Sequence, residues 1–208
     1  MTIESRRALI VIDVQNEYVS GGLRIEHPPV QASLARIGEA MDAAQAHGVP
    51  VVVVRNDAPE GSPLFARGSH GHRLHEVVAS RRHDLLLPKT LPSAFAGTEL
   101  AAWLAARELD TLAVAGYMTH NCVAATIFDA MHRGLTVECL LDACGSVPYR
   151  NDAGHASADA IHHAFGVVLH ARFAATTTTA AWIDAVHARR ALPRGSIVAS
   201  HAAALAQR

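Results

Sequence analysis

Short apolar runs recur along the chain and alternate with stretches of helical pattern. An uninterrupted apolar run is typical of a strand buried on both faces, so six runs predict strands of a covered sheet. The runs are ALIVID (8–13), PVVVVR (50–55), DLLLP (84–88), TLAVAGY (111–117), TVECLLD (136–142) and GVVLHAR (166–172).

Between these runs, apolar residues repeat at spacings of three and four, which predicts helices with one buried face. The stretch 31–48 shows this pattern most clearly, with Leu34, Ile37 and Met41 on one side. The other predicted helices span 98–110 with Thr98 as its N-cap, 121–134, about 152–164 and about 177–190. Alternating strands and helices predict an α/β fold, in which a parallel sheet carries helices on both faces.

The chain is predicted to form one domain over residues 1–190, since it contains no internal repeat and no low-complexity linker. Residues 191–208 follow a break at Pro193 and Gly195. This tail is either a short helix that packs on a neighbouring subunit or a frayed end.

Composition and charge exclude several classes of function. The 208 residues carry a formal net charge of -1 with the two signs interspersed, which argues against a nucleic-acid partner. The apolar run near the N-terminus is too short for a membrane span. Three cysteines, an odd number without CxxC spacing, fit a reduced, cytoplasmic protein. No GxGxxG follows the first strand, so no dinucleotide cofactor is expected.

Three reactive side chains are predicted at the carboxyl ends of strands, which is where open α/β sheets bind ligands. Asp13 ends the first strand, Lys89 follows the third and Cys122 follows the fourth. Lys89 is the only lysine, whereas the chain has 17 arginines. A compact ammonium differs from a planar guanidinium, so this exception indicates a site that requires lysine. The alternative is that Lys89 lies in an exposed loop and that its being lysine instead of arginine has no functional meaning.

Cys122 is expected in the first turn of a helix, where free backbone N–H groups and the helix dipole would lower the pKa of its thiol. The alternative is a small core residue, which is the usual role of a lone cysteine. Cys139 lies within a predicted strand and Cys144 in the loop after it, so both are interpreted as structural.

Three blocks of sequence, ALIVIDVQNEY, LPKTLPSAF and VAGYMTHNCVAAT, resemble in order and spacing the signatures of the isochorismatase-like cysteine hydrolases. The resemblance extends from about residue 6 to about 175. It implies a single three-layer αβα domain with a six-stranded parallel sheet, and an Asp–Lys–Cys triad at Asp13, Lys89 and Cys122. It also implies a cis peptide bond between Tyr117 and Met118.

Within this family, the triad implies hydrolysis of a C–N bond in a small amide, urea-type or lactam substrate through a thioester. Asp13 would move the proton, and the backbone N–H groups of Met118 and Cys122 would bind the oxyanion. A vinyl-ether hydrolase of the isochorismatase type and a non-catalytic binding protein on the same fold remain alternatives. The expected partners are a small-molecule substrate and further copies of the chain, as a dimer or tetramer.

The resemblance to nicotinamidases, which bind a metal through an Asp-x-His pair, is incomplete here. Asp57 matches the acid, but Pro59 stands where the histidine should be. His70, His72 and His75 form a cluster that more often marks a solvated helix start than a metal site. We therefore expect neither a metal nor another cofactor.

The signature blocks also contain candidates for the wall of the substrate pocket. The candidates are Tyr18, Phe95, Tyr117, His120 and Asn121. For Tyr18 and Phe95, a place in the core is an equal alternative.

Overall fold

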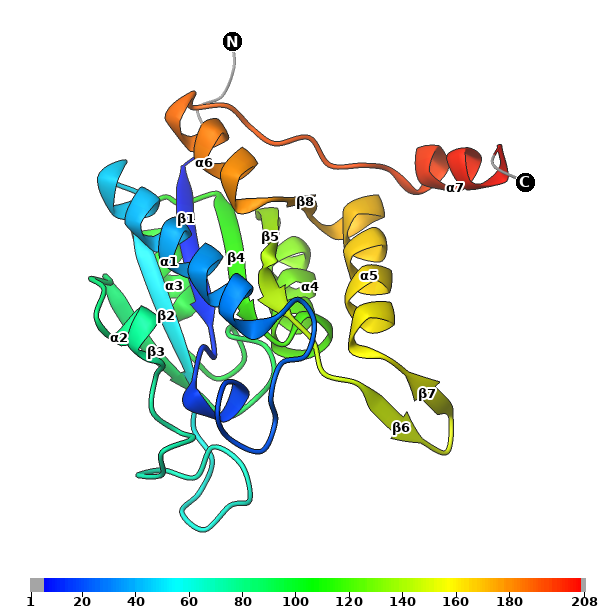
Figure 1. Ribbon diagram of the computed structural model, residues 1–208. Coiled ribbons are helices and arrows are strands. Elements are labelled where there is room, and N and C mark those ends of the chain that lie inside the picture. The colour runs from blue at the N-terminus through cyan, green and yellow to red at the C-terminus, as the bar shows by residue number, and fades with distance from the viewer. Residues whose placement is uncertain (1–5, 207–208) are drawn as a thin grey trace.

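The computed structural model describes residues 6–206, and a six-stranded parallel sheet lies at its centre (Figure 1). The strand order is β3-β2-β1-β4-β5-β8, and every neighbouring pair is parallel. The strands span Arg7–Ile12 (β1), Val51–Asn56 (β2), Leu85–Lys89 (β3), Thr111–Tyr117 (β4), Thr136–Gly145 (β5) and Ala175–Thr177 (β8). The predicted parallel sheet is confirmed.

Helices cover both faces of the sheet, which confirms the three-layer fold. The helices span Val30–Ala46 (α1), Glu76–Ala79 (α2), Leu100–Ala106 (α3), Ala124–His132 (α4), Ala158–Val168 (α5), Thr179–His187 (α6) and Ile197–Leu205 (α7). Successive residues of a strand point to opposite faces, so β1 serves two cores. Leu9 and Val11 pack with α1 and α6. Ile10 and Ile12 pack with α3 and α4 on the other side.

The last predicted strand, residues 166–172, is wrong. These residues belong to the end of α5 and to the π-helical turn Leu169–Phe173, while the sixth strand is the short β8 that follows. A short apolar run cannot by itself distinguish a strand from a helix. Here the apolar residues extend a helix that begins at Ala158, where the Ser157 side chain accepts a hydrogen bond from the N–H of Ala160.

Some predicted boundaries are also corrected. Strand β5 continues to Gly145, so Cys144 lies within the strand instead of in a loop. Helix α3 begins at Leu100 after Glu99, although the hydroxyl of Thr98 still accepts a hydrogen bond from the N–H of Leu100. The hairpin of Tyr149–Asn151 (β6) and Gly154–Ala156 (β7) was not predicted. Strands of three residues are too short to show an alternating pattern.

The tail contains α7, whose nine residues are all exposed or nearly so. Two residues of the predicted tail, 207 and 208, lie outside the described residues. Within residues 6–206, no helix is both long and apolar enough to cross a membrane.

Candidate active site

The carboxyl ends of β1 and β3 and the turn after β4 bring the three predicted residues together. The Nζ atom of Lys89 lies 2.7 Å from Oδ2 of Asp13 and 3.3 Å from Sγ of Cys122. The side chains of Asp13 and Lys89 have no exposed surface, and Cys122 is 6% exposed. An acid and a thiol that both contact one buried ammonium form a compact buried group rather than a solvated surface cluster.

Close contact between β1 and β4 depends on Gly116. Its φ of +111° favours glycine, and a Cβ atom there would collide with the carbonyl oxygen of Ile12. Asp13 follows Ile12 directly, with a φ of +53°, and Cys122 lies in the π-helical turn Thr119–Val123 that follows β4. The peptide bond between Tyr117 and Met118 is cis, at the position that the family resemblance implied.

Lys89 reaches across β2 to make its contacts, because β2 lies between β3 and β1 in the sheet. On the way, its ammonium also lies 3.5 Å from Oδ1 of Asn56, the last residue of β2. Asn56, Asp13 and Cys122 therefore offer three acceptors to the three N–H donors of one ammonium. Asn56 was missed by the sequence analysis, although its place at a strand end carries the same signal as Asp13.

Gln15 holds the ends of β1 and β2 in register at this point. Its amide nitrogen donates to the carbonyl oxygens of Asn56 (3.0 Å) and His72 (2.7 Å). Its amide oxygen accepts from the N–H of Asn56 at 2.9 Å. Since Gln15 is fully buried, this clamp fixes the backbone that carries Asn56 beside Lys89.

The electrostatics of Cys122 differ from the sequence-based expectation. Burial, reinforced by the neighbouring Asp13 carboxylate, raises the pKa of the Cys122 thiol to about 12, although Lys89 opposes the shift. The dipole at a helix start is weaker than the loss of solvation here. Burial therefore favours the thiol form of Cys122, which carries a proton.

Asp13 is the group placed to receive that proton. Burial raises the pKa of Asp13, and the Lys89 charge works against this rise. Burial works to lower the pKa of Lys89, but Asp13 and Cys122 hold it above its ordinary value. Asp13 is thus a stronger base than a solvated carboxylate, beside an ammonium that stays charged.

Comparisons with known proteins identify the family of this chain. The family model of the isochorismatase domain matches residues 7–181, which is most of the chain. This chain belongs to the isochorismatase family. It is a hydrolase of that family, and the expected resemblance is confirmed.

Solved and curated isochorismatase relatives span the chain to different extents. The crystal structure of a provisionally assigned isochorismatase from Burkholderia xenovorans LB400 is 63% identical, with a TM-score of 0.98 and 99% of each chain covered. The isochorismatase family protein YddQ of Bacillus subtilis is 28% identical over 85% of this chain and 98% of its own length. The ureidoacrylate amidohydrolase RutB of Methylobacterium radiotolerans is 31% identical over 65% of either chain.

Most of the predicted pocket residues of this isochorismatase-family site lie in the core, whereas His120 borders a cavity. Tyr117 is a core residue, since its ring is fully buried and its hydroxyl lies 2.7 Å from that of Ser33 in α1. Tyr18 packs on the rings of Phe65 and Tyr117, at centroid distances of 5.1 and 5.5 Å. Burial, reinforced by the Asp13 carboxylate, raises the pKa of Tyr18 well above its ordinary value.

Phe95 lies in the same apolar cluster as Cys122 and is 4% exposed, with the guanidinium of Arg133 over its ring at 4.8 Å. Its loop is tied to the nucleophile through Thr126, whose hydroxyl donates to the carbonyl of Cys122 and accepts from the N–H of Ala94. Asn121 is partly buried beside Cys122. Phe95 is thus both a core residue and a neighbour of the site.

His120 borders a cavity of about 440 Å³ that is lined mainly by the β6–β7 hairpin and α5, and none of the three triad residues lines it. Its ring packs edge-on against Tyr149 at 4.9 Å, and its Nδ1 lies 3.1 Å from the hydroxyl of Ser146. Its Nε2 is buried without a hydrogen-bond partner among the described residues, and burial lowers the pKa of His120. Tyr149, which the sequence analysis missed, also lines this cavity; burial and the charge of Cys122 raise its pKa.

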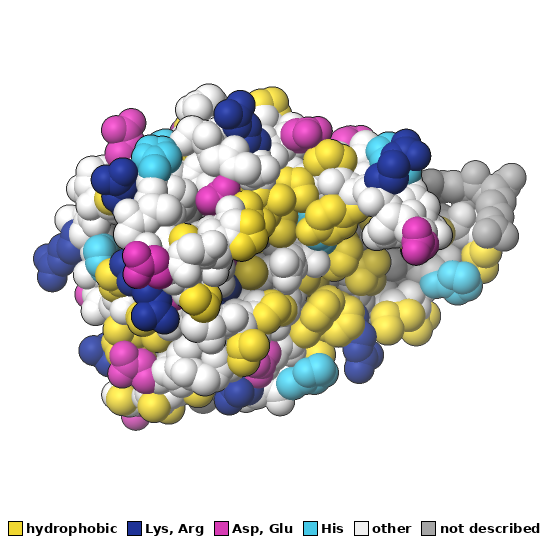
Figure 2. Space-filling model, turned by 90° about the horizontal axis from the view of Figure 1, so that it is seen from below, with side chains coloured by type: hydrophobic (Ala, Val, Ile, Leu, Met, Phe, Trp, Pro, Cys, Tyr) yellow, Lys and Arg dark blue, Asp and Glu magenta, His cyan; other side chains and the backbone are white. Residues whose placement is uncertain are grey.

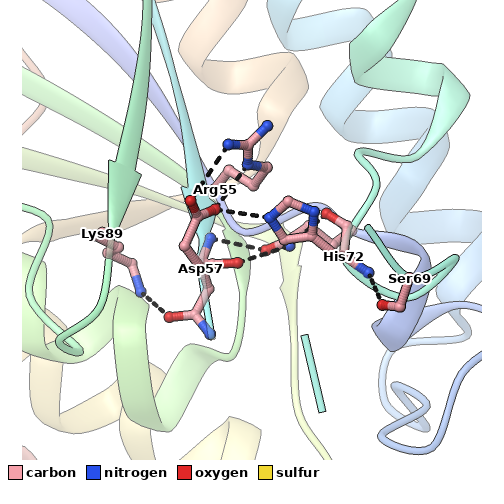
Figure 3. A network of polar contacts seen from close by, with 7 residues as sticks. Arg55, Asp57, Ser69, His72 and Lys89 are labelled. Carbon is pink, nitrogen blue, oxygen red and sulfur yellow. Dashed lines mark hydrogen bonds and ion pairs between the residues drawn. The ribbon is translucent and has the colours of Figure 1, made fainter. Parts of the chain in front are cut away.

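The predicted histidine cluster does not converge on one point. His72 was expected to be solvated and without an acid, but its Nε2 lies 2.8 Å from Oδ1 of Asp57 (Figure 3). His70 instead contacts Ser20, and His75 caps α2 by accepting from the N–H of Val77. Folding of the 57–75 loop, which sequence spacing does not reveal, decides these partners.

The carboxylate of Asp57 is already occupied by side chains of this protein. Arg55 donates to Oδ1 of Asp57 at 2.8 Å, the same oxygen that His72 contacts, while the Lys89 ammonium contacts Asn56 instead (Figure 3). Partial burial works to raise the pKa of Asp57, but Arg55 and His72 hold it below its usual value. Within residues 6–206, no group of three or more His, Cys, Asp or Glu side chains could hold a metal ion.

Proposed function

We propose that this isochorismatase-family hydrolase cleaves a C–N bond of a small amide, urea-type or lactam substrate through a thioester with Cys122. The observation that carries the proposal is the Lys89 ammonium between the Asp13 carboxylate and the Cys122 thiol. Such a group supplies a nucleophile, a base to activate it and a cation to hold both in place. If Asp13 and Lys89 formed only a structural ion pair, a thiol in contact with the ammonium would have no role.

In the first half of the reaction, Cys122 attacks the substrate carbonyl carbon as its proton passes to Asp13. The carbonyl oxygen becomes an oxyanion, which the backbone N–H groups of Met118 and Cys122 would bind. Protonated Asp13 then gives the proton to the leaving nitrogen. The C–N bond breaks, ammonia or an amine departs, and the acyl group remains on sulfur as a thioester.

In the second half, water attacks the thioester carbon and Asp13 takes one of its protons. Collapse of the tetrahedral intermediate breaks the C–S bond, releases a carboxylic acid and returns the proton from Asp13 to the Cys122 sulfur. The enclosure of the triad limits the substrate to a small molecule, since Asp13 and Lys89 are inaccessible from bulk solvent. His120 and Tyr149 then face its non-reacting part.

The curated relatives carry names of both reaction classes, since Isc1 of Verticillium dahliae, at 31% identity, is named a secreted isochorismatase effector. RutB, at 31% identity, is named as a ureidoacrylate amidohydrolase, an enzyme of the proposed reaction class. The chemistry of the site supports C–N hydrolysis, because transfer of an acyl group from an amide nitrogen to sulfur uses a nucleophile of the Cys122 kind. The identity of the acyl group is set by the pocket beside His120.

A substrate panel tests the proposal directly. Primary amides, N-carbamoyl compounds, ureas and lactams would each be incubated with the protein, and released ammonia or amine measured. We expect turnover of at least one class, and in the presence of hydroxylamine a hydroxamate product, because the thioester is open to attack by a second nucleophile.

The same panel identifies the alternatives. If no C–N substrate is cleaved while a vinyl ether is hydrolysed, the protein is an isochorismatase-type enzyme and the proposal fails. Binding of panel members without any turnover would instead indicate a non-catalytic protein.

Removal of metals is expected to leave the activity unchanged. Asp57, the residue that matches a metal ligand in nicotinamidases, is held by Arg55 and His72 through hydrogen bonds of 2.8 Å. The protein would be treated with EDTA, dialysed and assayed against an untreated sample on the same substrate. A loss of activity that zinc or manganese restores would contradict this prediction and return His72 and Asp57 to the list of ligands.

A further inference from the structure

The π-helical turn Thr119–Val123 carries Cys122, so the position of the proposed nucleophile depends on what holds this turn. The N–H groups of Asn121 and Val123 both donate to the carbonyl oxygen of Met118, at 3.0 and 3.2 Å. Turns of this kind are rare and occur often at functional sites. Because they are uncommon, contacts from other elements are expected to fix the shape of this one.

Thr119, the first residue of the turn, contacts His162 of α5. Its Oγ1 lies 2.9 Å from Nδ1 of His162, and the two residues are 0% and 4% exposed. The turn follows the carboxyl end of β4, at the face seen in Figure 2, where apolar side chains gather around the centre. A hydroxyl and an imidazole are costly to bury unless each finds a partner. The two side chains therefore depend on one another, and their contact ties α5 to the turn.

The ring of His162 is itself fixed by its neighbours. It packs edge-on against the ring of His27 at a centroid distance of 5.3 Å, and Nε2 of His27 lies 3.3 Å from Oδ1 of Asp159 on α5. The backbone of His27 exchanges two hydrogen bonds with Ser146. The hydroxyl of Ser146 lies 3.1 Å from Nδ1 of His120. The first two residues of the turn are thus each held from outside it.

His162 is suited to hold a position and not to carry a proton. Burial, reinforced by His27 and His163, lowers the pKa of His162 to about 4, although Asp159 opposes the shift. The imidazole is therefore neutral near pH 7. A neutral side chain that places a polar atom at the same point should be able to replace it.

We propose that His162 is a positioning residue, whose contact with Thr119 holds the π-helical turn so that Cys122 lies against Lys89. Thr119 directly follows Met118 and precedes Cys122 by three residues. A displaced Thr119 would therefore move the sulfur and both backbone N–H groups assigned to the oxyanion. The expected effect on turnover rests on the function proposed above, whereas the reactivity of the sulfur can be measured without it.

Two exchanges at position 162 separate the hydrogen bond from packing. Leucine and asparagine have nearly the same shape, but only asparagine places a polar atom near the position of Nδ1. His162→Leu and His162→Asn would be compared with Thr119→Val, which removes the hydroxyl, and with the double variant Thr119→Val/His162→Leu. His163→Leu is the control, since the side chain of His163 on the same helix is 80% exposed.

We expect His162→Leu and Thr119→Val each to lower kcat by at least about tenfold with KM unchanged, because displaced reacting groups slow the bound substrate. His162→Asn should stay within about threefold of the wild-type kcat, since it keeps a hydrogen-bonding atom. The double variant should be no slower than the slower single variant, because both changes remove one contact. His163→Leu should match wild type.

Equal losses in His162→Leu and His162→Asn would show that packing matters and not the hydrogen bond, and would overturn the proposal. A wild-type kcat in Thr119→Val would overturn it too. Thermal unfolding shows whether each variant is folded. Should His162→Leu fail to fold, Thr119→Val decides the outcome alone.

Alkylation of Cys122 by iodoacetamide, followed by mass spectrometry of its peptide, is a readout that does not require hydrolysis. A turn displaced from Lys89 loses the charge that opposes the rise in the pKa of the Cys122 thiol. We therefore expect slower alkylation in His162→Leu and Thr119→Val, and the wild-type rate in His162→Asn. If wild type cleaves no panel substrate, the proposed function fails, and this comparison still decides the inference: equal rates in all variants would overturn it.

Discussion

Cys122→Ala is expected to abolish hydrolysis while the protein stays folded. The variant lacks the sulfur that lies 3.3 Å from Nζ of Lys89, so the proposed thioester cannot form. Loss of a covalent nucleophile typically lowers kcat by at least about a thousandfold. The thiol makes one hydrogen bond to a charged group, and we expect its removal to cost about 1.5–3 kcal/mol of unfolding free energy at most.

Cys139→Ala is the matched control for this variant. Cys139 is a fully buried cysteine within β5, outside the triad, so its truncation should lower stability and leave kcat unchanged. Ammonia or amine release would be measured for both variants on the best panel substrate. If Cys122→Ala retained more than a few per cent of wild-type turnover, Cys122 could not be the nucleophile.

Lys89→Arg is expected to lower kcat by at least about a hundredfold, although it preserves the formal charge. The ammonium contacts Asp13, Cys122 and Asn56 at 2.7, 3.3 and 3.5 Å, so its three donors point in three directions. A guanidinium is planar and prefers a bidentate grip on one carboxylate. It would pin Asp13 as an ion pair, and a misplacement of about 1 Å can already cost about a hundredfold in rate.

The same substitution should also lower the melting temperature by several degrees. From the sequence alone, a lysine in a strand-end loop predicts little change in stability. The Lys89 side chain is completely buried, however, and overpacking a filled site costs about 1–3 kcal/mol. In a protein of this size, each 1 kcal/mol shifts the melting temperature by about 2–4 °C.

Arg172→Lys, the reverse exchange at an exposed position, is the control for Lys89→Arg. It should alter neither kcat nor the melting temperature, since an exposed cation makes few fixed contacts. Both variants would be compared with wild type by steady-state kinetics and thermal unfolding. Near-normal turnover in Lys89→Arg would show that the site needs only a positive charge and that the single lysine is an accident.

Some features that sequence reasoning missed share one physical cause, which is burial. The thiol of Cys122 was expected to ionise easily at a helix start, but the loss of solvation raises its pKa to about 12. His72 was expected to be solvated, yet its side chain is 11% exposed and binds Asp57. Short-range spacing reveals neither exposure nor the partner of a group, because both depend on residues distant in the chain.

The positions of the strand ends, by contrast, could be predicted from the sequence alone. Continuous apolar runs mark buried parallel strands, and the residues that end them meet at one edge of the sheet. Asp13 and Lys89 follow from this rule, and Asn56 would have followed had it been applied to the second strand. The run 166–172 was misread because α5 is apolar on its outward face too, so that no polar residues revealed its helical period.

The sequence by itself therefore determined the α/β class, five of the six strands and the three residues proposed for catalysis, since these depend on local pattern and strand order. Only the tertiary structure decided which side chains contact one another in the site. Lys89 reaches across β2 to Asp13. The ring of His120 packs against that of Tyr149, which belongs to a hairpin that the sequence pattern did not predict. Contacts of this kind join residues far apart in the chain, and folding alone brings them within reach.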